Sequence, residues 1–272
     1  MESRNPVLRN ANERYAHDLQ GQAGATAPMM TAEQLAALYE QPAAVKPSER
    51  LSLDDVVVKT GGLFVVLLVG AVVSWNIALD YPLVWIGAAL VGFGLAMVNI
   101  FKKQVSPPLV LAYALVQGVF LGGISRWYDV SFSEGGTSIV LQAVIGTLTA
   151  FGVMLALYAT GVIKVTGRFR KVMIVALVSY LGIAVVSLIA SFFGVGGGWG
   201  FYGVDGIGLL LCAAGVLLAS FTLALDFDAI SQSVKLGAPE RESWRLAFGL
   251  LVTLIWLYLE ILRFLAILNS NN

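Results

Sequence analysis

From Val56 onward, the sequence alternates long apolar runs with short polar breaks. A helix needs about 20 apolar residues, at roughly 1.5 Å each, to cross the hydrocarbon core of a bilayer. Seven runs come near this length, and each predicts one membrane-spanning helix. The predicted spans cover residues 56–79, 81–101, 107–128, 137–161, 172–193, 206–230 and 244–268. The pattern therefore predicts an all-α integral membrane protein, a seven-transmembrane-helix bundle.

The two ends of the chain lie outside this apolar pattern. Residues 1–55 carry no long apolar run and are predicted to form a cytosolic N-terminal tail. One short helix is expected near residues 31–40, because Thr31 and Gln34 fit a capping box ahead of an apolar face. Residues 269–272 are predicted to form a short polar tail after the last span.

The boundaries between the runs carry recognisable signals. Ser52 and Asp55 fit a capping box just before the first span. Pro82 predicts a turn between the first two spans, because proline cannot continue the hydrogen bonds of the preceding helix. The glycine-rich stretch Gly194–Gly200 predicts a loop. Aromatic residues in and after this stretch are expected to anchor it at the headgroups: Trp199, Phe201 and Tyr202.

Composition agrees with a protein whose main solvent is lipid. Hydrophobic residues make up 58% of the 272 positions and charged residues only 12%, against about 25% charged in soluble domains. This balance excludes a soluble enzyme, a disordered chain and a fibrous protein. Seventeen basic residues offset seventeen acidic ones, so nothing indicates a nucleic-acid partner. The partner that the composition does predict is the lipid bilayer.

The residue types that carry most enzyme chemistry are scarce. The single histidine, His17, lies in the N-terminal tail, which excludes histidine-paired metal sites and Ser-His or Cys-His pairs from the apolar body. The single cysteine, Cys212, cannot close an internal disulfide and is expected to pack as a small hydrophobe. No phosphate-binding glycine loop or nucleophile elbow is present. We therefore expect neither an enzyme nor a bound cofactor.

The charges of the breaks alternate along the chain. One set of breaks collects nearly all the basic residues outside the tail: Lys102, Lys103, Lys164, Arg168, Arg170, Lys171, Lys235, Arg241 and Arg245. The other set holds Arg126 alone. By the positive-inside rule, this pattern predicts a cytosolic N-terminus, an external C-terminus and residence in the cell's inner (plasma) membrane.

Four charged residues lie in or beside the last two spans, where lipid makes charge expensive. Asp226 and Asp228 lie at the end of the sixth run, and Glu260 and Arg263 lie inside the seventh. A carboxylate at the centre of a span costs about 2.5–3.5 kcal/mol even on the lenient insertion scale. The two aspartates fit either a solvated helix end or a functional site. Glu260 fits either an ion pair with Arg263, three residues on, or an ion or proton site.

These residues resemble the Bax-inhibitor family of seven-helix membrane proteins. The resemblance rests on an aspartate ending the sixth span and on a last span that reads Leu-Tyr-Leu-acid with a later Leu-Arg pair. Residues 4–8 and 54–61 are similar to the bacterial branch. The resemblance implies a pH-sensitive calcium-leak channel, in which one acid on the sixth helix and one on the seventh close the pore near its cytosolic mouth.

The family's acids map onto this chain in two ways. Asp226 matches the sixth-helix acid, because Ile230 then falls on the family's isoleucine, and Asp228 takes a position usually held by glutamine. For the seventh helix, aligning the Leu-Tyr-Leu-acid motif places the family's acid at Glu260. Aligning the later Leu-Arg pair places it at Thr253 instead. Glu260 lies about 21 Å along its helix from the cytosolic side. A direct pair with Asp226 therefore needs a tilted or unwound helix, and Asp228 is the nearer acid.

Two functions follow as hypotheses. The first is a cation leak controlled by an ion or proton site of Asp226, Asp228 and Glu260, supported by Arg263 and Thr253, with calcium as the candidate transported ion. The second is a non-transporting regulator that binds another membrane protein, such as a quality-control protease, through the long N-terminal tail. The sequence leaves the oligomeric state open.

Overall fold

The structure is a computed structural model that describes residues 50–133, 138–203 and 206–270. The short helix expected near residues 31–40 lies outside the described residues, as does the rest of the chain before residue 50.

Seven long helices carry the fold, and all seven are long and apolar enough to cross a membrane. The prediction of an all-α seven-helix membrane protein is therefore confirmed. The long helices are α3 (Leu53–Ile77), α4 (Pro82–Phe101), α5 (Pro107–Phe132), α6 (Ile139–Ala159), α7 (Gly167–Phe192), α8 (Ile207–Lys235) and α9 (Ser243–Ser270). Short 3-10 turns lie between them: η2 (Val195–Gly198), η3 (Gly200–Gly203) and η4 (Glu240–Glu242).

Several helix ends follow directly from local sequence. Ser52 caps α3 in a capping box, in which Asp55 N–H donates to the Ser52 hydroxyl and the Asp55 carboxylate accepts from Ser52. Pro82 is the first residue of α4, where its missing N–H breaks no helical bond. Helix α8 continues beyond the apolar run that ends at Ile230, to Lys235. The extra turn moves Asp226 away from the helix end.

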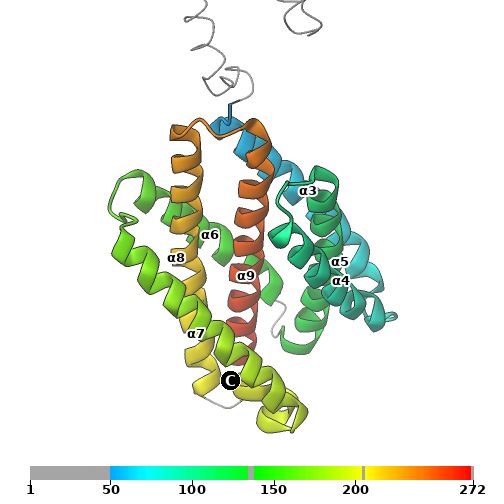
Figure 1. Ribbon diagram of the computed structural model, residues 1–272. Coiled ribbons are helices and arrows are strands. Elements are labelled where there is room, and N and C mark those ends of the chain that lie inside the picture. The colour runs from blue at the N-terminus through cyan, green and yellow to red at the C-terminus, as the bar shows by residue number, and fades with distance from the viewer. Residues whose placement is uncertain (1–49, 134–137, 204–205, 271–272) are drawn as a thin grey trace, which may run out of the picture. The chain divides into compact units, whose positions relative to one another are not determined.

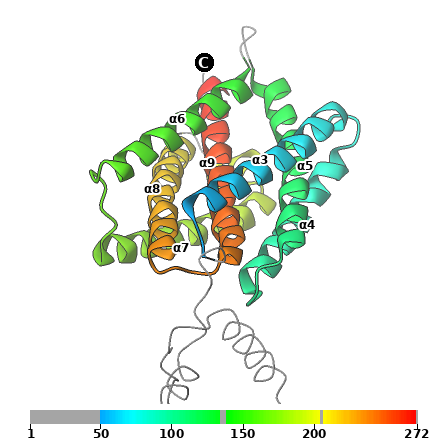
Figure 2. The same ribbon diagram turned by 90° about the horizontal axis from the view of Figure 1, so that it is seen from above.

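Helix α9 lies at the centre of the described bundle (Figures 1 and 2). It packs against α3, α5, α6 and α8, while α4 packs mainly on α5. In the most apolar stretches of α5 and α9, 44% of the residues are buried, against 11% in α4 and α7. The outer helices instead present large apolar side chains outward, such as Leu83 and Phe192. This arrangement suits a protein surrounded by lipid.

The tightest helix crossing joins α3 and α5. Gly118 and Gly122 lie one turn apart on α5, and a Cβ atom on either would collide with the backbone of α3, at Leu67 and at Ala71. From α3, Gly70 approaches α5 in the same way. Without side chains at these glycines, the two backbones come close enough for extensive dispersion contact, which replaces the hydrophobic effect inside a membrane.

The loop after α7 folds back onto the bundle. Five of its glycines, at positions 194, 196, 197, 198 and 200, adopt positive φ angles that other residues avoid. Trp199 packs against the rings of Trp127 and Tyr128 on α5. The Tyr202 hydroxyl, in contrast, reaches inward to α7. The loop is thus present as predicted, but Tyr202 contributes to the interior of the bundle rather than to its rim.

The loops rich in basic residues gather at one end of the bundle, which we call the basic end. Arg241 Nε donates to the Val105 carbonyl at 3.1 Å, and Arg245 donates to the Lys103 carbonyl at 2.8 Å. The basic end therefore comprises the α4–α5, α6–α7 and α8–α9 connections and the start of α3. Its residues are Lys102, Lys103, Lys164, Arg168, Arg170, Lys171, Lys235, Arg241 and Arg245.

Candidate functional site

Glu260 lies inside the bundle, on the face of α9 that turns toward α7 and α8. The residue is only 4% exposed. Its Oε1 atom accepts hydrogen bonds from the Tyr180 hydroxyl at 2.8 Å and from Trp256 Nε1 at 3.0 Å. Arg263 Nη1 lies 3.7 Å from the same oxygen. Three donors from two helices thus converge on one carboxylate oxygen.

A second layer of aromatic contacts surrounds these donors. The Tyr202 hydroxyl donates to the Tyr180 hydroxyl at 3.0 Å, so Tyr202, Tyr180 and Glu260 form a hydrogen-bonded chain. The guanidinium of Arg263 lies 4.4 Å from the centre of the Tyr202 ring, within the range of a cation–π contact. Arg263 is therefore held between a carboxylate and an aromatic face.

The surroundings of Glu260 suit the ionised carboxylate. Each neighbour of Oε1 is a donor, and Oε2 is buried without a hydrogen-bond partner among the described residues. A protonated carboxyl would need an acceptor for its own hydrogen, and Oε2 has none in this part of the chain. The site thus holds a buried ion pair with Arg263, which matches the first of the two expectations for Glu260.

Gly215 on α8 makes room for this arrangement. A Cβ atom on Gly215 would lie 2.7 Å from the carboxyl carbon of Glu260 and would also collide with the Tyr180 hydroxyl. Only glycine therefore lets α8 pass this close to the polar cluster.

A cavity of about 890 Å³ opens beside the cluster, between α5, α7, α9 and the loop after α7. Glu260 and Arg263 lie in its wall, together with Tyr180 and Tyr202. The α7 side of the cavity is apolar and includes Leu181. The cluster thus borders an open cavity rather than lying wholly within the packed core.

Asp226 lies on α8 at a different depth. Its Oδ2 atom is buried and has no hydrogen-bond partner among the described residues. The Thr253 hydroxyl of α9 lies beside this carboxyl group, and it also donates to the Gly249 carbonyl at 3.2 Å. Asp226 lies about 14 Å from the basic end of α8, and Thr253 about 15 Å from the start of α9. The two residues therefore face each other at one level.

Asp226 and Glu260 are not brought together. Glu260 follows Thr253 by seven residues, which places it about 10 Å farther along the helix axis. The partners of its carboxyl are Tyr180, Trp256 and Arg263. Of the two ways to match the seventh-helix acid, the geometry next to Asp226 selects Thr253, a hydroxyl where the resemblance implies an acid.

Asp228 lies apart from both acids. Side chains two positions apart on a helix point in different directions. The Asp228 side chain therefore turns away from that of Asp226, toward the start of α7. It accepts from Arg170 at 2.9 Å and from Gln232 at 2.6 Å. Asp228, the nearer acid in sequence, is thus paired with Arg170 at the basic end and not with Asp226.

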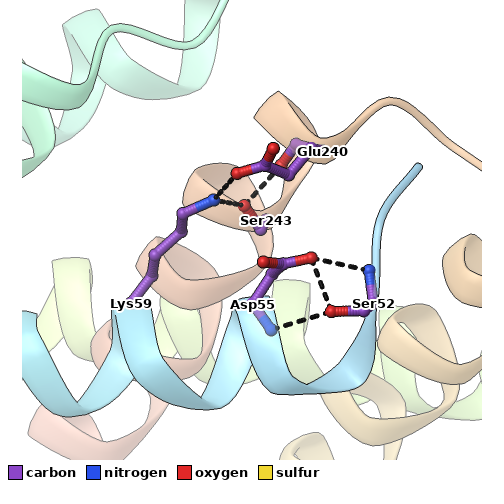
Figure 3. A network of polar contacts seen from close by, with 5 residues as sticks. All are labelled: Ser52, Asp55, Lys59, Glu240 and Ser243. Atoms are coloured by element: carbon purple, nitrogen blue, oxygen red, sulfur yellow. Dashed lines mark hydrogen bonds and ion pairs between the residues drawn. The ribbon is translucent and has the colours of Figure 1, made fainter. Parts of the chain in front are cut away.

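The basic end contains a polar network that the sequence analysis missed (Figure 3). Lys59 of α3 donates to the Glu240 carboxylate at 2.9 Å and to the Ser243 hydroxyl at 2.6 Å. Ser243 in turn donates to the Glu240 carbonyl. A short antiparallel bridge between Arg50 and Pro239 lies alongside. These contacts tie the start of α3 to the α8–α9 connection.

Two of the three donors to Glu260, Trp256 and Tyr180, were also missed. Trp256 lies four residues before Glu260, a spacing that could have been recognised because it places both on one helix face. Tyr180 is 80 residues away in sequence, and no local pattern connects it to α9. The same is true of Lys59 and Glu240, which are 181 residues apart.

Comparison with known proteins agrees with these observations. The sequence profile of the family described as Bax inhibitor 1 like matches residues 5–270, nearly the whole chain. No curated protein matches the sequence closely. With seven membrane-spanning helices and a family match of this extent, the chain belongs to the Bax inhibitor 1-like family of multi-pass membrane proteins.

Proposed function

We propose that this protein is a cation leak in which protonation of Asp226 controls passage. The observation that carries this proposal is the buried Oδ2 of Asp226, which has no hydrogen-bond partner in the described part of the chain and lies on a membrane-spanning helix. An ionised carboxylate in apolar surroundings is unstable unless water, a cation or a proton joins it. Asp226 is therefore a group whose charge state responds to its surroundings.

Thr253 supplies a reason for two states of this site. A hydroxyl has one hydrogen to donate, and Thr253 directs it to the Gly249 carbonyl. A protonated Asp226 can donate to the Thr253 oxygen and complete a chain of hydrogen bonds. An ionised Asp226 needs the Thr253 hydrogen for itself, so the hydroxyl must turn away from Gly249. Loss of the proton is thus coupled to a small rearrangement between α8 and α9.

Glu260 has a different part in this proposal. Its charge is balanced by Arg263, and Tyr180 and Trp256 donate to it, so it is a fixed structural element of the site. An ionised Asp226 attracts cations, and a neutral one does not. We therefore expect flux to fall as the medium is acidified. Calcium is the candidate ion because carboxylate, carbonyl and water oxygens are the ligands that it prefers.

The test is calcium flux into proteoliposomes that contain the full chain. Asp226→Asn together with Glu260→Gln should abolish most of the flux and its pH response. Asp54→Asn is the matched control, because Asp54 is exposed at the start of α3 and should leave the flux unchanged. Unaltered flux and an unaltered pH response in the double variant would overturn the proposal.

A regulator that binds another membrane protein is the second candidate. It is favoured by the long polar segment of residues 1–49, which precedes the membrane domain in the sequence. Removal of this segment should abolish capture of the partner and leave calcium flux in proteoliposomes intact. Full capture by the shortened chain would count against this candidate.

A further inference from the structure

A long apolar groove lies on the side of the bundle away from Glu260. Helices α3 and α6 both pack against α9 (Figure 2) and leave the groove between them. Thr60 lines it near the basic end and Trp75 near the opposite end. Leu148 of α6 forms part of the far wall, and Tyr258 of α9 forms part of the floor. The surface that these residues present to the groove is almost entirely apolar.

The groove is long and has a volume typical of a ligand pocket. Thr60 and Trp75 are 15 residues apart on α3, which gives a length of about 22 Å. The volume is about 570 Å³, within the range of about 300–1,000 Å³ for ligand pockets. An extended hydrocarbon chain suits an apolar channel of this length. The groove is also longer than one leaflet of about 15 Å.

A charged side chain stands at the end of the groove near Trp75. The guanidinium of Arg126 lies 5.3 Å from the centre of the Trp75 ring. Among the described residues, its carboxylate partner is Asp129, whose Oδ2 lies at a long 3.9 Å, while the other oxygen, Oδ1, accepts from Ser133 and Ser138. Arg126 is also the one basic residue among the breaks at the end opposite the basic end. It is thus loosely held and available to an anion.

We propose that this groove is a binding site for one phospholipid, with an acyl chain between α3 and α6 and the phosphate on Arg126. The polarity of the site matches such a molecule: a cation and an aromatic ring at the headgroup level, then an apolar channel directed toward the other leaflet. Arginine binds phosphate with paired N–H donors. The tryptophan ring suits the boundary between headgroups and hydrocarbon. The proposal is independent of any ion flux.

The experiment is native mass spectrometry of the delipidated full-length protein titrated with dioleoyl phosphatidylglycerol. We expect Arg126→Gln to weaken binding about tenfold, because a charge-assisted contact to phosphate is lost. Val144→Trp, which fills the groove from α6, should weaken it at least as much. Dioleoylglycerol, with the same chains and no phosphate, should bind the wild type no better than it binds Arg126→Gln.

Two control variants separate this site from general lipid contact. Arg168→Gln removes an exposed charge at the basic end, and Val91→Trp adds a ring to the exposed face of α4. Both should bind like the wild type. If Val144→Trp does not fold, Leu148→Phe serves as the smaller filling variant. Unchanged binding in Arg126→Gln, or in the folded filling variant, would overturn the proposal.

Discussion

The Glu260–Arg263 pair is the residue-scale feature with the largest expected effect on stability. Arg263 is about 30% exposed in its side chain, while that of Glu260 is about 5% exposed. Removing one member of a buried pair leaves the other charge without compensation, whereas removing both does not. Loss of either member alone should therefore destabilise the fold much more than loss of both.

This argument predicts a thermodynamic cycle. Arg263→Gln should destabilise the folded protein by about 3 kcal/mol, because Glu260 keeps its buried charge. The double variant Arg263→Gln, Glu260→Gln should recover much of that loss. Unfolding in detergent followed by circular dichroism measures both. If the double variant were destabilised as much as Arg263→Gln or more, the two charges would not be coupled.

Gly215 supports a second prediction at this scale. Gly215→Ala should destabilise the protein by about 1–3 kcal/mol, the usual effect of forcing an extra group into a packed site. Gly182→Ala on α7 is the control, since a Cβ there has nothing within 4 Å. Thermal unfolding should separate the two variants, and a wild-type melting temperature for Gly215→Ala would contradict the close approach of α8 to Glu260.

At the scale of helices, contacts of two kinds hold α3 in place. The first is the backbone approach to α5 at Gly118 and Gly122, and the second is the Lys59–Glu240 ion pair at the basic end. Glu240 is about half exposed, and exposed ion pairs contribute about 1 kcal/mol or less. The helix crossing involves backbone collisions that cannot be relieved by a side chain turning away. The α3–α5 crossing should therefore contribute more to stability than the Lys59–Glu240 ion pair.

The comparison of two glycine variants tests this ranking. Gly122→Ala should lower stability by about 2 kcal/mol or more, because α3 and α5 must separate. Gly62→Ala, on α3 with no atom within 4 Å of the added Cβ, should be neutral, and Glu240→Gln should lose less than Gly122→Ala. A larger loss of stability in Glu240→Gln than in Gly122→Ala would show that the ion pair contributes more than the helix crossing.

The sequence predicted the elements better than it predicted the site. Apolar run length, the Ser52 capping box and Pro82 are local signals, so seven helices and several of their ends were predictable. The Glu260–Arg263 contact was also local, at three residues. The donors Tyr180 and Tyr202 were not, because burial of a tyrosine hydroxyl beside a distant acid depends on how α7 and its loop pack. The place of Asp226 within its helix did not follow from apolar run length, because α8 continues through polar residues to Lys235.

At the scale of the whole molecule, the charge pattern predicts orientation in the membrane. The basic end should face the cytosol. A membrane-impermeant thiol reagent should label Arg168→Cys only in inverted vesicles, and a cysteine in place of Trp199, in the loop after α7, only in intact cells. Cys212 is fully buried and should give no background. Labelling of Arg168→Cys from outside intact cells would contradict the predicted orientation.

The central claim is that the charge state of Asp226 controls a cation leak. The most direct test is the pH profile of calcium flux in proteoliposomes for two single variants. The account predicts that Asp226→Asn gives a flux that no longer changes with pH, while Glu260→Gln, if it folds, keeps the fall on acidification. A pH response that survives in Asp226→Asn would contradict it.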